Sequence, residues 1–134
     1  MMKGNSSLYI FKIGMSEYQC ITTTDVGDVI VVSLNDHKVM DPSRIQLLGE
    51  ELLSLAGNGD EVPKVLINLE NVRFLSSAAI NKLIVLEKRL KSGGGGVKIS
   101  NVSPEVGEVF SITHLDSVFD IRDDQRDALE AFAS

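Results

Sequence analysis

Two short and almost wholly apolar runs most constrain how this chain folds. VIVVSL occupies residues 29–34 and KVLINL occupies residues 64–69. A strand that lacks polar alternation is covered on both faces, as are the strands of parallel sheets. A helical pattern separates the two runs, which therefore predict buried strands of a mainly parallel sheet with helices packed on it.

Other segments supply the remaining elements of an alternating strand and helix pattern. YQCITTT (18–24) alternates like a strand, and the turn at 26–28 joins it to residues 29–34 as an antiparallel hairpin. In the segment 41–57, Asp41 is expected to cap a helix and Gly57 to stop it. Further along, we expect a helix over 77–91, a glycine connector at 92–96, a strand at 97–100, a helix capped by Ser103, a strand at 118–121 and a last helix over 123–133.

The expected fold is α/β: a mixed, mainly parallel β-sheet with an N-terminal antiparallel hairpin and about four helices. Residues 1–15 are interpreted as a tail or an extra strand, and residues 16–134 as a single domain. The residues expected to face the core are Ile45, Leu48, Leu52 and Leu55 in the first helix, Ala79, Leu83, Leu86 and Leu90 in the second, and Val106, Val109 and Phe110 in the third.

Charge and cysteine content exclude several classes of function. With 13 basic and 19 acidic residues, the net charge of −6 disfavours non-specific nucleic-acid binding and docking on anionic lipid. Cys20 is the only cysteine, so an internal disulfide is impossible, and a buried structural thiol in a cytoplasmic protein is expected. No apolar run has the length of a membrane span.

The chain lacks the groups that an enzyme would need. His37 and His114 lie in loop-like contexts without neighbours at metal-ligand spacing, so neither a metal nor another cofactor is expected. Ser76 lacks the G-x-S-x-G elbow of a nucleophile. SGGGGVKIS lacks the spacing of a phosphate-binding loop and follows a helix where that motif follows a strand.

The adjacent hydroxyls of Ser76 and Ser77 stand where an apolar run meets a helical pattern. Either serine can cap the helix, which contributes about 1 kcal/mol. The same free amides and the positive end of the helix dipole would also stabilise a phosphate. A serine here is physically suited to be a switch, and capping is the simpler interpretation.

VLINLENVRFLSSAAINKLIVL, followed by GGGGVKISNVSPEVGEVFSITHLDSVFDI, resembles the STAS domain of bacterial anti-sigma-factor antagonists. The family pattern is an apolar strand, a D-[ST]-[ST]-G turn and a helix, then a strand, S-P-x-V, a short helix and G-L-x-x-x-F. The matching stretch covers roughly residues 18–132, and LNDHKVMDP places Asp41 at the family's usual acidic position.

The resemblance implies a binding protein that is not an enzyme and whose partner is an anti-sigma factor that is also a serine kinase. Binding would free a sigma factor, and phosphorylation at Ser76, or at Ser77 as second choice, would end the complex. The implied partner surface is the start of the helix at 76–83 and the loop 35–41. Its residues are Asp41, Leu75, Ser76, Ser77, Ala78, Ala79 and Lys82.

Three residues depart from the family pattern: Leu75 replaces Asp, Ala78 replaces Gly and Ala79 replaces Leu. The lost carboxylate is expected to weaken kinase recognition, and Ala78 fits if its φ is helical. The alternative function is therefore a STAS scaffold that is not phosphorylated and serves as a subunit of a larger regulatory or transporter-associated complex. A third possibility is a small-molecule binder or enzyme that uses the glycine connector. The sequence leaves the sigma factor, the kinase and the oligomeric state open.

Overall fold

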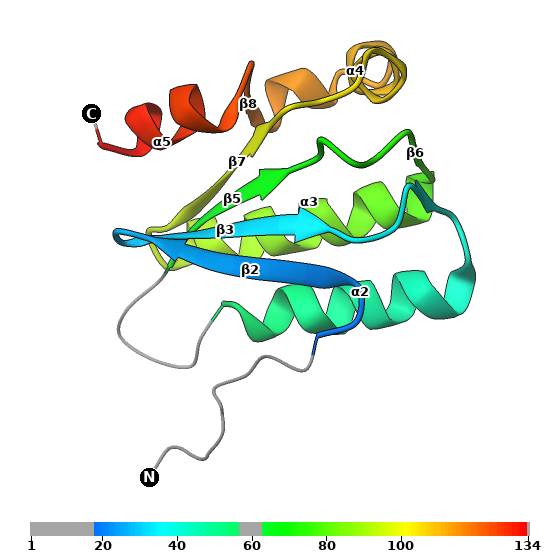
Figure 1. The fold of residues 1–134 in the computed structure, drawn as a ribbon, viewed down its shortest axis with the longest axis horizontal. Coiled ribbons are helices and arrows are strands. Elements are labelled where there is room, and N and C mark those ends of the chain that lie inside the picture. The colour runs from blue at the N-terminus through cyan, green and yellow to red at the C-terminus, as the bar shows by residue number, and fades with distance from the viewer. Residues whose placement is uncertain (1–17, 57–62, 134) are drawn as a thin grey trace, which may run out of the picture.

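The computed structural model describes residues 18–56 and 63–133, and its centre is a five-stranded sheet with the order β2-β3-β5-β7-β8 (Figure 1). The strands are β2 (Ile21–Val26), β3 (Val29–Leu34), β5 (Lys64–Asn68), β7 (Gly96–Ser100) and β8 (Asp120–Arg122). β2 and β3 pair antiparallel, whereas β3 with β5, β5 with β7 and β7 with β8 are parallel. The predicted mixed sheet with its N-terminal hairpin is confirmed. The expectations for residues 1–15 and Gly57 fall outside the described residues.

Four α-helices in the described part of the chain surround this sheet. They are α2 (Pro42–Ser54), α3 (Ser77–Ser92), α4 (Pro104–Ile112) and α5 (Gln125–Ala133). α2 and α3 cover one face, α5 lies over the other, and α4 lies near β6 (Phe74–Leu75) at one end of the fold (Figure 1). None of these helices combines the length and apolarity needed to cross a bilayer.

The sequence of the central strand β5 is apolar because both of its faces are buried. Val65, Leu66 and Ile67 are each 0% exposed. Val65 and Ile67 point into the larger core under α2 and α3, whereas Leu66 joins a smaller core with Ala128 of α5. Because helices cover both faces, no position in the middle of this strand tolerates a polar side chain.

The helices bury the stripes that their spacing predicts. Ile45, Leu48 and Leu52 of α2 are buried, and Leu55 packs partly buried beside them. On α3, Ala79, Leu83, Leu86 and Leu90 are all 0% exposed. α3 ends at glycines as expected: Gly94 has φ +94°, and the Gly95 amide donates to the Leu90 carbonyl at 2.8 Å.

Two expectations in the C-terminal part were wrong. Val109 is 37% exposed, because the short α4 turns only Val106 and Phe110 toward the core. The last strand begins at Asp120, two residues later than expected, and a 3₁₀ helix (Leu115–Ser117) precedes it. β7 offers a partner to β8 only from Lys98 onward, so Val118 remains outside the sheet.

Two buried glutamates of the helices accept hydrogen bonds from backbone amides near the starts of strands. The spacing of apolar residues in the helices does not predict that these two charged side chains are buried. Glu51 of α2 accepts hydrogen bonds from the amides of Gln19 and Cys20, both at 2.9 Å. Glu87 of α3 accepts one from the Val97 amide at 3.0 Å. Each carboxylate thus provides a buried amide at the start of a strand with the acceptor that it needs.

Candidate functional site

Ser76 is the N-cap of α3. Its backbone is extended (φ −69°, ψ 162°), and its Oγ accepts a hydrogen bond from the Ala79 amide at 3.2 Å. The side chain is half-buried, whereas Ser77, the first residue of the helix, is exposed. The two hydroxyls therefore differ: Ser76 caps the helix and Ser77 faces solvent. Neither is sealed in the interior.

Two loops meet at this helix end through a two-stranded sheet, β4 (Lys38–Val39) with β6 (Phe74–Leu75). The His37 carbonyl accepts from the Arg73 and Phe74 amides at 2.8 and 3.2 Å, and the Ser76 amide donates to the Val39 carbonyl at 3.1 Å. Both loops follow the C-terminal ends of parallel strands, β3 and β5, so they lie at the same sheet edge. The expected juxtaposition of loop 35–41 with the start of α3 is confirmed.

Alternation in β4 and β6 sorts their side chains into an inner and an outer pair. Val39 pairs with Leu75, and both are buried at 4% and 5% exposure. Lys38 pairs with Phe74, which is 45% exposed. Met40 is 55% exposed at the next position along the loop. We call the two-stranded β4–β6 sheet, together with the start of α3, the platform that carries Ser76. An aromatic ring, a thioether and an ammonium group thus lie on its outer side.

A charged pair braces the 35–41 loop against α2. The Arg44 guanidinium donates from Nε to Asp36 Oδ2 at 3.0 Å and from Nη2 to Asp36 Oδ1 at 2.9 Å. These hydrogen bonds, which the Asp36 carboxylate accepts, are the main cause that raises the pKa of Arg44, and the nearby Cys20 side chain adds to it. The two-point geometry fixes the loop orientation more firmly than a single contact would.

Five of the predicted site residues around the serine pair differ in accessibility. Asp41 is the exposed N-cap residue of α2, but its side chain makes no capping bond and instead accepts from the Ser43 hydroxyl at 2.9 Å. Leu75 and Ala79 are buried, so they shape the platform from below. Ala78 is exposed, and Lys82 is half-buried.

The departures from the family pattern are accommodated structurally. Ala78 lies within helical α3 and does not have a positive φ, so its methyl group causes no backbone strain. Leu75 packs beside Val39 in the main core. Ala79, the third departure, is 0% exposed in the same core. Apart from these three residues, Lys82 lays its methylenes over α2, since a Cβ at Gly49 would lie 2.7 Å from Lys82 Cδ.

The electrostatics of this edge are compatible with an added anion. Among the ion pairs of the described residues, none involves Lys38, Arg73 or Lys82. The start of α3 carries no acidic residue in its first turn. A phosphate on Ser76 would therefore meet the positive end of a helix in a surrounding that contains free cations.

In the part of the chain that the structure describes, no three His, Cys, Asp or Glu side chains gather in an arrangement that could hold a metal ion. His37 holds the two loops together, with Nδ1 2.7 Å from the Asn71 carbonyl.

The sequence analysis did not identify Phe74 and Met40 as surface residues. The alternation RFLS carries the signal, but a two-residue strand is too short for its inner and outer faces to be assigned beforehand.

A mixed sheet with an N-terminal antiparallel hairpin, and a serine at the start of the helix after its central strand, define a class of α/β domain. The family model described as "STAS domain" matches residues 20–128. This chain belongs to the STAS domain family.

Particular relatives share most of the chain. The "Anti-sigma-B factor antagonist" of Bacillus subtilis is 28% identical over 90 residues, which are 67% of this chain and 80% of that protein. An anti-sigma-factor antagonist (STAS) domain protein from Planctomyces limnophilus has a solved structure with a TM-score of 0.74 and 32% identity, covering 85% of this chain and 98% of that one. The murine anion transporter Slc26a9 shares the fold with a TM-score of 0.67 at 14% identity, over 83% of this chain and 19% of the transporter.

Proposed function

We propose that this chain is an anti-sigma-factor antagonist that binds an anti-sigma factor with serine kinase activity and is switched by phosphorylation at Ser76. The observation that carries the proposal is the position of Ser76 at the N-cap of α3, on a platform that the 35–41 loop completes. The chain's role is that of a binding partner and kinase substrate, and it performs no catalysis. Relatives named as antagonists support this class of function.

The outer side of the platform provides the contact surface. Phe74 and Met40 are exposed apolar side chains beside Lys38, and interfaces are enriched in aromatic residues and methionine. Phe74 is the anchor that we expect to contribute most, because a large ring buried at the centre of an interface dominates its binding energy. The exposed Ser77 and Ala78 border this surface.

Phosphorylation would act by charge. A phosphoserine carries about −1.5 to −2 charge at pH 7. At Ser76 the helix amides stabilise that charge, so the fold is retained. A partner that has closed over Phe74 and Met40 would have to desolvate the new anion, which weakens the complex.

The test mixes the purified chain with its anti-sigma factor and ATP and then locates the phosphate by mass spectrometry. We expect phosphate on Ser76 in the wild type and in Ser77→Ala, and none in Ser76→Ala. Complex formation that leaves both serines unmodified would refute the switch while retaining the binding function.

A binding series tests the surface independently of phosphorylation. Phe74→Ala should weaken the complex at least about tenfold, as expected for a hot-spot ring. Val26→Ala is the matched control, because Val26 is 38% exposed at the hairpin on the other end of the sheet. Equal loss in both variants would show that Phe74 is not part of the contact.

The second candidate function is a STAS subunit without a switch. It is favoured by Leu75, which is 5% exposed and places no carboxylate beside the serine hydroxyl. Ser76→Asp discriminates the two functions. An antagonist loses its partner in this variant, whereas a fixed subunit binds as the wild type does.

A further inference from the structure

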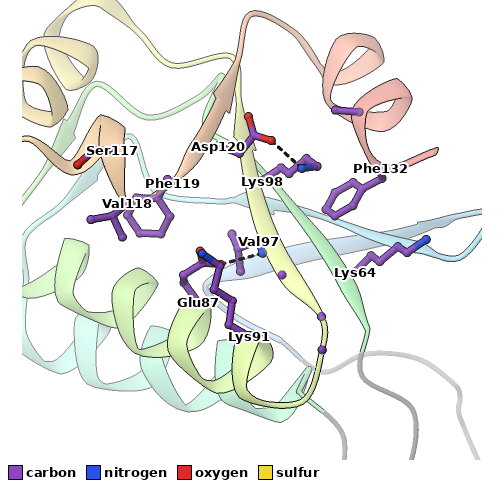
Figure 2. A pocket seen from close by; sticks show the side chains of 14 residues that line it. Lys64, Glu87, Lys91, Val97, Lys98, Ser117, Val118, Phe119, Asp120 and Phe132 are labelled. Atoms are coloured by element: carbon purple, nitrogen blue, oxygen red, sulfur yellow. Dashed lines mark hydrogen bonds and ion pairs between the residues drawn. The ribbon is translucent and has the colours of Figure 1, made fainter. Parts of the chain in front are cut away.

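A hollow of about 550 Å³ lies at the end of the sheet opposite Ser76. Figure 2 shows it between the end of α3, the start of β7 and the end of α5. Lys64 and Gly96, the first residues of β5 and β7, line it, whereas Ser76 follows the other ends of these strands. The volume is that of an ordinary small-molecule site.

Three lysines line this hollow in a chain whose net charge is −6, and each of them pairs with a carboxylate. Lys98 Nζ lies 2.6 Å from Asp120, and Lys91 Nζ lies 3.3 Å from the buried Glu87. Lys64 Nζ pairs with Asp28 outside the lining, at 2.9 Å. An ammonium group has three donors, so a single carboxylate leaves donors available on each lysine.

The wall beside these cations is aromatic and apolar. Lys98 Nζ stands 4.9 Å from the centroid of the Phe132 ring, which is the geometry of a cation–π contact. Val118, which is 41% exposed, lines the hollow near the buried Phe119 (Figure 2). The Phe132 ring thus offers an apolar face next to a cation, whereas Val118 lies on the other side of β7.

The glycines of the connector keep the hollow open. Gly94, Gly95 and Gly96 form part of the lining, and a Cβ added at Gly96 would meet no atom within 4 Å. Gly96 does not have a positive φ, so a larger residue there would project into free space without backbone strain.

We propose that this hollow binds a small aromatic carboxylate, with its ring against Phe132 and its carboxylate hydrogen-bonded by the lysines. Asp120 is shared between Lys98 and Arg122, so the ion pairs at this site leave one positive charge over, which a single carboxylate would balance. A polyphosphate would exceed that balance and face Glu87 and Asp120. The site lies away from the Ser76 platform, so its occupation does not depend on the proposed function.

The test follows backbone amide resonances of the full-length protein during titration with 1-naphthoate. We expect saturable shifts at Gly94, Gly95, Gly96 and Phe132, complete at about 1 mM or below, an affinity usual for a ligand of this size. Neutral 1-naphthalenemethanol, inorganic phosphate and ATP should bind at least tenfold more weakly. No saturable shift at these amides, or an equal response to any of the three comparison compounds, would overturn the proposal.

Variants locate the binding. Gly96→Leu fills the hollow and should weaken naphthoate binding more than tenfold, and Phe132→Leu, which removes the ring and keeps an apolar side chain, should weaken it severalfold. Lys98→Gln should weaken it about tenfold, whereas Lys88→Gln, an exposed lysine of α3 outside the lining, should not. If Gly96→Leu fails to fold, Phe132→Leu and Lys98→Gln decide the question. Wild-type affinity in the folded variants would overturn the assignment.

Discussion

The hydrogen bond that caps α3 leads to a graded prediction for the two serines. The Ser76 hydroxyl accepts from the Ala79 amide at 3.2 Å in a half-buried position, and Ser77 provides no cap. Ser76→Ala removes the only side-chain acceptor at this N-cap and should lower the free energy of unfolding by about 1 kcal/mol, within a usual range of about 0.5–2. Ser77→Ala should change it by less than about 0.5 kcal/mol, as exposed substitutions do.

The aspartate variant completes the series. Asp is as good an N-cap as Ser, and its charge interacts favourably with the helix dipole by about 0.3–1 kcal/mol. Ser76→Asp should therefore be at least as stable as the wild type. Loss of partner binding in this variant would then be attributable to charge at the interface, because the fold is intact.

Urea unfolding followed by circular dichroism measures all three variants. The slope m should stay constant, since the surface exposed on unfolding is unchanged, and only the midpoint should move. The reasoning would be refuted if Ser77→Ala lost as much stability as Ser76→Ala. It would equally be refuted if Ser76→Ala stayed within about 0.3 kcal/mol of the wild type, well below the usual cost of a lost cap.

Other parts of the fold give further expected outcomes. Leu83 is 0% exposed, so Leu83→Ala should cost about 2–5 kcal/mol in urea unfolding, and a loss under about 1 would contradict its place in the core. Burial raises the pKa of the Cys20 thiol above its ordinary value of 9.0, so a thiol reagent at pH 8 should modify the native protein far more slowly than the urea-unfolded one, and equal rates would contradict this. Hydrogen bonds from Arg122, then Lys98, lower the pKa of Asp120 below its ordinary 3.8. Because the folded-state value is the lower one, this carboxylate stabilises the fold above about pH 3.8, and the contribution is lost as the pH falls below it. Asp120→Asn should therefore be less stable than the wild type at pH 6 by up to about 1 kcal/mol, and the two stabilities should converge as the pH falls below 3.8.

Local patterns in the sequence were sufficient for the elements and much of their order. The uninterrupted apolar run at 64–69 could only be a strand covered on both sides, and Leu83, Leu86 and Leu90 could only be one buried stripe. The serine pair was located at a helix start because capping depends on a residue and its immediate neighbours. Such features depend on short stretches of chain, so periodicity and capping chemistry reveal them.

The residues whose exposure the sequence did not predict correctly share a physical cause. Val109 has the spacing of a core residue, but α4 is short and tilts it outward. Phe74 faces solvent because β6 pairs with β4, from a segment more than thirty residues earlier in the chain. A two-residue strand has no periodicity of its own, so only its partner determines which side chain points outward.

The sequence by itself determined the fold class, the helix that begins at Ser77 and the buried character of Cys20, because each follows from local pattern, capping or composition. The tertiary structure decided which hydroxyl caps α3, which side of the platform Phe74 occupies, and that lysines of β5, α3 and β7 converge around the glycine connector. These arrangements arise when distant segments pair and pack, and the geometry of that packing is not contained in any short stretch of the chain.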